Sequence, residues 1–212
     1  MQAFFSEYGS QLISNILQHI LISFSALFLG AVVAIPLGVL LTRTPKIASI
    51  VIGITSALQT IPSLALLTLM IPFLGVGVAP AIVALFIYSL LPILRNTYIG
   101  MKNVDPSYLD VSKGMGMTNL QSILSVEIPI ALPTIMAGVR LAAVYVVAWA
   151  TLASYIGAGG LGVLIFSGLD NYQPPLIFAG TIPVILLAII SDYLLGKLED
   201  KLTPSALKEE NE

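Results

Sequence analysis

Three observations predict an all-α polytopic membrane protein with five transmembrane helices. Hydrophobic residues make up 57% of the 212-residue chain and charged residues only 9%, and the mean hydropathy is +0.98. Several uncharged apolar stretches approach the roughly 20 residues that a helix needs to cross about 30 Å of hydrocarbon. Basic residues gather in the short segments between these stretches. Together these features indicate one domain, residues 1–212, built for a bilayer.

Short polar segments separate the predicted spans. The spans are Leu21–Leu41, Ile47–Phe73, Val76–Leu94, Leu141–Ile156 and Tyr172–Ser191. When the segments between them are assigned alternately to the outside and the inside, beginning outside, all nine Lys and Arg residues fall on or next to the inner side. By the positive-inside rule, the N-terminus is then outside and the C-terminus cytoplasmic.

This assignment divides the domain into five parts. We expect an outer lead-in at 1–19, three spans in 20–100, a cytoplasmic segment at 101–133, two spans with an outer glycine-rich loop in 134–195, and a cytoplasmic tail at 196–212.

The N-terminal segment is expected to be retained, because no Lys or Arg precedes Arg43 and a signal peptide needs a positive start. Residues 1–17 are too short to span and are interpreted as an interfacial lead-in to the first span. We interpret His19 as a boundary residue, since a lone histidine without a partner is weak support for a proton relay or a metal site.

The second span contains Gln59, Pro62 and Pro72. Each proline removes a backbone donor and bends a helix. Residues 59–67 either line a polar path or form a packing kink, and the sequence leaves both interpretations open.

After the fourth span, residues 154–169 contain five glycines and no charge. The run GAGGLG within them does not indicate a nucleotide site, because that fingerprint needs a preceding strand and a following amphipathic helix. We interpret this segment as a re-entrant or gate-forming loop, where irregular backbone is tolerated because protein or a cavity surrounds it.

Capping signals in the cytoplasmic segment predict a first short helix. Asp105 is a good N-cap, and Pro106 suits the first helical position, where a missing amide donor costs nothing. Gly114 or Gly116 ends this helix.

A second short helix is predicted to follow at once. Thr118 and Gln121 have the spacing of a capping box, and the helix runs about two and a half turns to Glu127. Pro129 and Pro133 then lead into the fourth span. The result is a helix-turn-helix hairpin at the membrane surface.

Several classes of function are excluded or disfavoured. The chain has no cysteine for a disulfide or a thiolate site, and no basic patch with interleaved aromatic residues for nucleic acid. A secondary transporter or channel is disfavoured because the predicted spans are nearly free of ionisable residues. An intramembrane enzyme would need paired carboxylates, a Ser/His set or metal ligands at membrane depth, and the one histidine, His19, does not provide such a set. We therefore expect no catalytic residues, no bound metal and no cofactor in this chain.

The hairpin resembles the cytoplasmic signature of permease subunits of ATP-binding-cassette (ABC) importers, which reads EAA, three residues, G, nine residues, then I-x-L-P. Asp110-Val111-Ser112 takes the first place, Gly116 the second and Val126-Glu127-Ile128-Pro129 the third, with the spacing kept. The first triplet departs from the consensus at every residue, and Val126 and Ile128 replace its isoleucine and leucine.

The rest of the chain, from Leu29 to Pro204, is similar to permease subunits of bacterial osmoprotectant importers, which take up glycine betaine, carnitine or choline. The similarity is carried by the runs QTIPSLALLTLMIPFLGVG, PAIVALFIYSLLPILRNTYIG and WATLASYIGAGGLGVLIF. It implies the type I ABC importer permease fold, a second permease chain, two cytoplasmic ATPases that use ATP and Mg²⁺, and an extracellular substrate-binding lipoprotein. This chain has no Walker lysine motif, so the hydrolysis is expected in the partner. A permease for another small solute, such as an amino acid, is the alternative.

The resemblance also implies which residues contact the ATPase. They are Asp110, Gly114, Met115, Gly116, Met117, Thr118, Leu120, Gln121, Ile128 and Pro129. For the translocation pathway the candidates are Gln59, Tyr88, Tyr98, Tyr145, Trp149 and Tyr155. Aromatic faces bind quaternary ammonium ions by cation–π attraction, but aromatic residues are also common anchors at membrane boundaries.

Overall fold

The computed structural model describes residues 2–204, with side chains from Tyr8 onward. Its α-helices are α1 (Gln2–Leu41), α2 (Pro45–Gln59), α3 (Ser63–Leu74), α4 (Val78–Lys102), α5 (Pro106–Gly114), α6 (Asn119–Ser122), α7 (Ile128–Trp149), α8 (Gly162–Asp170) and α9 (Pro174–Leu202). A π-helical segment, η1 (Ile123–Glu127), joins α6 to α7, and a 3₁₀ segment, η2 (Ala150–Ile156), follows α7. The predicted all-α class is confirmed.

Four helical stretches are long and apolar enough to cross a membrane. They are Tyr8–Leu41, Val78–Lys102, Asn119–Ile156 and Pro174–Leu202. The pair α2 and α3, bent by 98°, adds a fifth when it is counted as one span. This number agrees with the five predicted spans.

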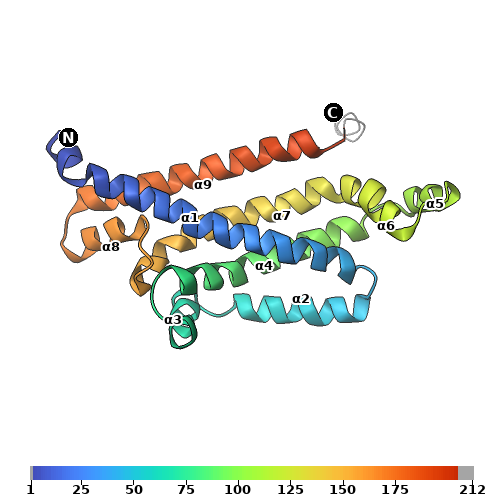
Figure 1. The fold of residues 1–212 in the computed structure, drawn as a ribbon, viewed down its shortest axis with the longest axis horizontal. Coiled ribbons are helices and arrows are strands. Elements are labelled where there is room, and N and C mark those ends of the chain that lie inside the picture. Colours follow the sequence, from blue (N-terminus) through green and yellow to red (C-terminus); the bar gives the residue numbers. More distant parts are fainter. Residues whose placement is uncertain (1, 205–212) are drawn as a thin grey trace.

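The long helices run side by side along the long axis of the molecule (Figure 1). One end of the bundle carries α5 and α6, and we call it the hairpin end. The opposite end carries α3 and α8, and we call it the loop end. The N-terminus lies at the loop end, and α9 finishes at the hairpin end.

Helix α1 begins at Gln2 and is continuous to Leu41, so residues 2–17 are not a separate lead-in. Gly9 does not interrupt it, because one glycine inside a helix costs only about 1 kcal/mol. Helix α9 continues to Leu202, so the first part of the predicted tail is helical, and residues 205–212 lie outside the described part of the chain.

The fourth span starts earlier than the sequence predicted. Helix α7 begins at Ile128 instead of Leu141 and includes Pro129 and Pro133. Pro129 lies in the first turn, where the missing amide is tolerated, and internal prolines are tolerated in membrane helices because neighbouring groups satisfy the freed backbone. The last residues of the predicted cytoplasmic segment, 128–133, are therefore helical and continuous with the fourth span.

The second span is broken at Thr60–Pro62, between α2 and α3. Pro62 precedes the first residue of α3, whereas Pro72 lies inside that helix. Of the two interrupting prolines, only Pro62 marks a break.

Helix α4 packs against both α1 and α7, and glycines allow the close approach. A Cβ added at Gly30 of α1 would lie 1.9 Å from Ser89 Oγ of α4, and one added at Gly38 would lie 2.7 Å from Thr97 Cβ. Gly138 of α7 packs on the other side of α4, beside Asn96. The bundle core of α1, α4 and α7 thus depends on glycines at the helix contacts.

We expect Gly138→Ala to destabilise the protein. The new Cβ would lie 2.6 Å from Asn96 Cβ and 2.7 Å from the Pro92 carbonyl oxygen, and overpacking of this kind costs about 1–3 kcal/mol. Gly53→Ala is the matched control, because nothing lies within 4 Å of its Cβ position. Thermal unfolding in detergent should show a lower Tm for Gly138→Ala alone, and equal Tm values for the two variants would contradict this packing.

Candidate functional site

The hairpin begins with a capped helix. The carboxylate of Asp105 accepts a hydrogen bond from the Ser107 amide at 2.8 Å, and Pro106 occupies the first turn of α5. The bond from Ser107 holds the pKa of Asp105 below its usual range. The predicted start of this helix is confirmed.

Helix α5 ends in a Schellman motif. The Gly116 amide donates to the Lys113 carbonyl at 2.9 Å and the Met117 amide to the Ser112 carbonyl at 3.0 Å. Gly116 has φ +76°, a left-handed conformation that residues with a Cβ rarely adopt. Gly116, and not Gly114, is therefore the residue that turns the chain.

The second helix has the predicted capping box but a different course. The Thr118 amide donates to Gln121 Oε1 at 2.8 Å, and the Gln121 amide donates to Thr118 Oγ1 at 3.4 Å. Helix α6 has only four residues and passes into η1 and then α7 without a break. The predicted second helix, to Glu127, is thus a short α-turn plus a π segment that is continuous with the long helix α7.

Most residues predicted to contact the ATPase lie at the exposed tip of the hairpin. Met115 is 71% and Leu120 65% exposed, and Asp110 forms an exposed ion pair with Lys113 at 3.5 Å. Gly114, Gly116, Thr118 and Gln121 are also exposed, and Met117 is half-buried. Ile128 and Pro129 are half-buried in the first turn of α7 and do not belong to the tip.

Behind the tip lies an ion pair that sequence analysis missed. Glu127, 3% exposed, is the last residue of η1, and both of its carboxylate oxygens accept hydrogen bonds from Arg43 Nη2, at 2.5 and 2.6 Å. Arg43 lies in the turn between α1 and α2. The one available signal was that Glu127 is the only charged residue between Lys113 and Arg140.

Four of the candidate pathway residues come together at the break between α2 and α3. The Tyr88 hydroxyl donates to the Ile61 carbonyl, and Gln59 Nε2 donates to the Tyr88 carbonyl at 3.4 Å. Trp149 packs edge-on against Tyr88, with 4.4 Å between ring centroids, and stacks on Tyr145 at 5.6 Å. Tyr88 is buried, whereas Tyr145 is 40% exposed, so the cluster presents one accessible ring.

The other two aromatic candidates are not part of this cluster. Tyr155 lies in η2 and packs against Phe166 of α8, with ring centroids 4.2 Å apart. Tyr98 lies near the other end of α4 under the ammonium group of Lys102.

The glycine-rich segment is largely helical, since η2 covers 150–156 and α8 covers 162–170, and only residues 157–161 are irregular. This short loop docks on α1. The Gly160 amide donates to Gln18 Oε1 at 3.2 Å and the Leu161 amide to His19 Nδ1 at 3.4 Å. Gly159 and Gly160 both have positive φ, and a Cβ at Gly159 would lie 2.3 Å from Gln18 Oε1.

The sequence suggested that His19 is a boundary residue, and the structure corrects this. The side chain of His19, which lies in α1, is fully buried, and its Nε2 donates to the Val147 carbonyl of α7 at 2.9 Å. Because Nδ1 accepts from Leu161, the imidazole joins α1, α7 and the glycine loop. The partners of His19 are 128 and 142 residues away in the sequence, so no local pattern indicated them.

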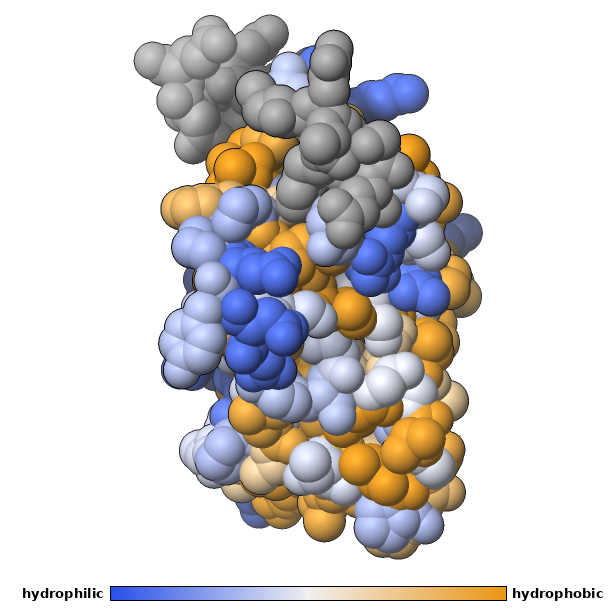
Figure 2. Space-filling model, turned by 90° about the vertical axis from the view of Figure 1, so that its left-hand side faces the viewer, coloured by the Kyte–Doolittle hydropathy of each residue, from blue (hydrophilic) through white to orange (hydrophobic). Residues whose placement is uncertain are grey.

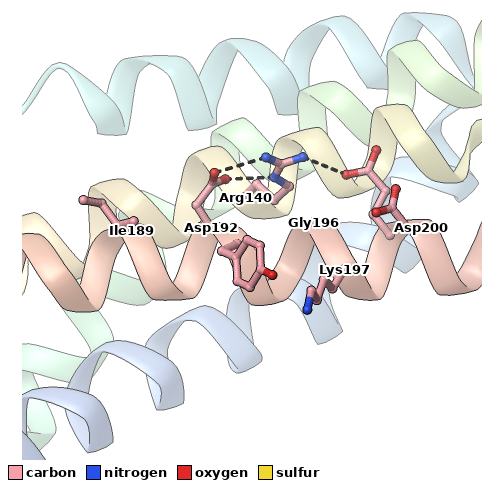
Figure 3. A pocket seen from close by; sticks show the side chains of 8 residues that line it. Arg140, Ile189, Asp192, Gly196, Lys197 and Asp200 are labelled. Carbon is pink, nitrogen blue, oxygen red and sulfur yellow. Dashed lines mark hydrogen bonds and ion pairs between the residues drawn. The ribbon is translucent and has the colours of Figure 1, made fainter.

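A second group of charges joins α7 to α9 (Figure 3). Arg140 donates from Nε and Nη2 to both oxygens of Asp192, at 2.8 and 3.1 Å, and from Nη1 to Glu199 at 3.0 Å. These groups line an open hollow of about 440 Å³. Lys197, on the same wall, lies over the Tyr193 ring at 4.6 Å. Arg140, Asp192 and Glu199, which line this hollow, are paired with one another. We therefore interpret the hollow as a structural feature and not as a binding site.

The loop end has a mixed surface. Figure 2 looks onto this end, where hydrophilic and hydrophobic side chains are interspersed. Tyr172 and Asp170 are exposed here, in the connection from α8 to α9. A mixed surface of this kind suits a region outside the hydrocarbon.

The five-span bundle with a helical hairpin at one end is the architecture of an ABC importer permease subunit. Solved structures agree. The permease fold in inward-facing MetNI methionine ABC transporter structures matches this chain with a TM-score of 0.83 at 23% identity, over 91% of this chain and 96% of that one. An amino acid ABC transporter solved with histidines matches with a TM-score of 0.70 at 19% identity, over 92% and 94%.

Residues 34–204 match the family "Binding-protein-dependent transport system inner membrane component", and the chain belongs to this family. It is 60% identical to the carnitine transport permease protein OpuCB of Listeria monocytogenes, over 99% of this chain and 96% of the relative. It is 53% identical to the glycine betaine/carnitine/choline transport system permease protein OpuCB of Bacillus subtilis (strain 168), over 98% and 96%.

These matches make the chain a multi-pass transport subunit and not an enzyme. The family implies an ATPase and a substrate-binding protein as partners, with ATP hydrolysis in the separate subunit.

Proposed function

We propose that this chain is one permease subunit of an ATP-driven importer that moves a quaternary-ammonium osmoprotectant, such as glycine betaine, carnitine or choline, into the cell during osmotic stress. The observation that carries the proposal is the near full-length similarity to permeases named for these solutes, at 60% and 53% identity. A choline transport system permease of Bacillus subtilis (strain 168), 52% identical, supports the same class of cargo.

The proposal places the hairpin end in the cytoplasm. Basic residues gather at the helix ends there: Arg43 and Lys46 around the α1–α2 turn, Lys102 at the end of α4, Lys113 at the end of α5 and Lys201 at the end of α9. The positive-inside rule then puts the N-terminus outside and the C-terminus inside.

The exposed tip of the hairpin, Met115–Gln121, is the proposed contact with a cytoplasmic ATPase. The apolar side chains of Met115 and Leu120 are exposed to solvent, and exposed apolar side chains are expected on a surface that a partner covers. Asp110 and Gly114 of α5 adjoin this surface. Ile128 and Pro129 lie behind it, in the first turn of α7. ATP and Mg²⁺ act in the ATPase, whose closure displaces the hairpin.

The complete importer would contain two ATPases, this permease, a second permease that is either a copy or a relative, and an extracellular substrate-binding lipoprotein. The relatives include OpuCB and OpuCD permeases of the same named system in Bacillus subtilis, 53% and 39% identical to this chain. This pair of relatives favours a related second chain.

For the passage we propose the cluster of Gln59, Tyr88, Tyr145 and Trp149. The exposed face of Tyr145, backed by Trp149, offers a π surface to a trimethylammonium group, and such contacts are worth about 2 kcal/mol when desolvated. The cluster contains no charged side chain. It therefore offers the trimethylammonium group an aromatic face and does not hold it with a fixed counter-ion. Tyr155 lies apart from the cluster, beside Phe166, and is the weaker candidate.

A strain that lacks the chain, and has no redundant system, should lose the rescue of growth at high salt by betaine, carnitine or choline. The wild-type gene should restore it. Full rescue without the chain would exclude these cargoes.

In reconstituted complexes, Tyr145→Ala should raise KM for the transported solute by up to roughly 30-fold, because it removes a cation–π contact of about 2 kcal/mol. Tyr155→Ala, which removes an aromatic ring outside the cluster, is the matched control. An unchanged KM in Tyr145→Ala would remove the aromatic cluster from the passage.

Gly116→Val should uncouple ATP hydrolysis from transport. Position 116 has open space around its Cβ but a positive φ, so valine strains the backbone by about 1–3 kcal/mol and reshapes the tip without a clash. Gly53→Val is the matched control, because its Cβ also meets open space and it lies inside helix α2, away from the hairpin. Substrate moved per ATP hydrolysed is the measurement. Normal coupling in an assembled Gly116→Val complex would contradict the role of the tip.

The orientation can be tested directly because the chain has no cysteine. In intact cells, a membrane-impermeant maleimide should label Asp170→Cys at the loop end and spare Lys113→Cys on the hairpin. Inside-out vesicles should give the reverse pattern. Labelling of Lys113→Cys in intact cells would invert the proposed topology.

A further inference from the structure

The turn between α1 and α2 contacts the hairpin through a buried salt bridge. Glu127 is almost fully buried, and a buried carboxylate is costly unless a cation and further hydrogen bonds compensate it. Arg43 provides the cation and reaches both carboxylate oxygens from a side chain that is 48% exposed. The carboxylate is thus fixed inside the protein, whereas the guanidinium belongs to the surface turn.

Two serine hydroxyls extend this contact into the hairpin. Ser122 Oγ of α6 lies 3.4 Å from Glu127 Oε1 and 3.0 Å from Ser112 Oγ of α5. Both serines are buried. The polar chain Arg43–Glu127–Ser122–Ser112 therefore joins the α1–α2 turn to both helices of the hairpin.

Glu127 also lies at a special point of the backbone. In η1 the Ile128 amide bonds to the Ile123 carbonyl, five residues back, where an α-helix would bond four back. Such π turns are rare and are frequent at functional sites. The continuous helix from the hairpin tip into α7 thus changes its hydrogen-bond register at the residue that Arg43 holds.

Helix α2 starts two residues after Arg43 and is weakly attached to the rest of the described chain. Ala48 is its only buried residue. At its far end, Gln59 and the break contact Tyr88 through the two hydrogen bonds described above. A displacement of Arg43 would therefore be transmitted along α2 to Gln59 and the aromatic cluster.

We propose that the Arg43–Glu127 ion pair is a strut that carries the movement of the hairpin to α2, in parallel with the covalent route through η1 into α7. This inference rests on the proposed function, in which the hairpin is moved by an ATPase. Arg43 and Glu127 are positioning residues, since they act through α2 on the break at residues 60–62. Without the strut, the hairpin moves α7 but leaves α2 behind.

The test uses the reconstituted importer with whichever of betaine, carnitine and choline the unmodified complex transports, and measures uptake and ATP hydrolysis together. Glu127→Gln and Arg43→Gln should each raise the ATP consumed per solute by roughly fivefold or more, as expected for two residues in contact. The double variant should be no worse than the more severe single variant, because one interaction is lost in all three. Arg43→Lys, which keeps the charge, should recover part of the coupling. Lys46→Gln, an exposed cation of the same region, is the control and should couple normally.

A second measurement follows the movement itself. In the cysteine-free chain, Thr60→Cys reports on the break and Lys113→Cys on the hairpin. With wild-type Arg43 and Glu127, maleimide labelling at both positions should change when ATP and vanadate are added. With Glu127→Gln or Arg43→Gln, the change should persist at 113 and disappear at 60. Glu127→Gln leaves only the half-exposed guanidinium of Arg43 unpaired, so it serves where Arg43→Gln, which leaves the buried carboxylate uncompensated, does not assemble.

Several results would overturn the strut. They are unchanged coupling in an assembled Arg43→Gln complex, additive losses in the double variant, or a labelling change at position 60 that survives the loss of the ion pair. Failure of the proposed function is distinguishable, because the unmodified complex would then show no uptake of betaine, carnitine or choline linked to ATP. If Gly116→Val uncouples the importer but Arg43→Gln does not, the hairpin keeps its role and only the strut is rejected.

Discussion

The structure depends on the requirement that every backbone amide and carbonyl be hydrogen-bonded where water is absent. Regular helices meet this requirement alone, so the informative places are those where the helices are interrupted. Three interruptions stand out in the described chain: residues 60–62, residues 157–161 and the π segment η1. At the first two, polar side chains bond to the irregular backbone: Tyr88 bonds to Ile61, and Gln18 and His19 bond to the glycine loop. At the third, the side chain of Glu127, the last residue of η1, bonds to Arg43.

The helices of the bundle differ in how closely they are packed. Helices α1, α4 and α7 approach closely at glycines such as Gly38 and Gly138. Helix α2 has one buried residue and α9 has few, so their positions rely more on polar contacts such as those of Arg43 and Arg140. A transport cycle needs groups of helices that move relative to one another, and the distribution of close contacts indicates that α1, α4 and α7 move as one unit.

Sequence analysis predicted what depends on local chemistry and missed what depends on distant contacts. Hydropathy gave five spans, and Asp105 and the Thr118–Gln121 pair gave the helix starts of the hairpin, because capping is decided within four residues. Helix α7 begins at Ile128, before the predicted fourth span at Leu141, because its first turn tolerates Pro129. His19 was misinterpreted because both of its partners are more than a hundred residues away. The structure brings together four of the pathway candidates, Gln59, Tyr88, Tyr145 and Trp149. Their positions along the sequence did not show that these four form a cluster while Tyr155 and Tyr98 lie elsewhere.

The charges inside the long helices bear on how the transporter is energised. An ion-coupled carrier needs an ionisable group that can gain and lose its ion within the membrane. In the described chain, Glu127 and Asp192 are each held by an arginine, and Glu199 shares the guanidinium of Arg140 with Asp192. A carboxylate that is fixed by a neighbouring arginine is poorly suited to releasing and rebinding an ion in each cycle, because each release would leave the arginine uncompensated. All three carboxylates also lie towards the hairpin end, on the side where the ATPase is proposed to bind. Their chemistry therefore suits the transmission of movement between helices better than the transfer of ions.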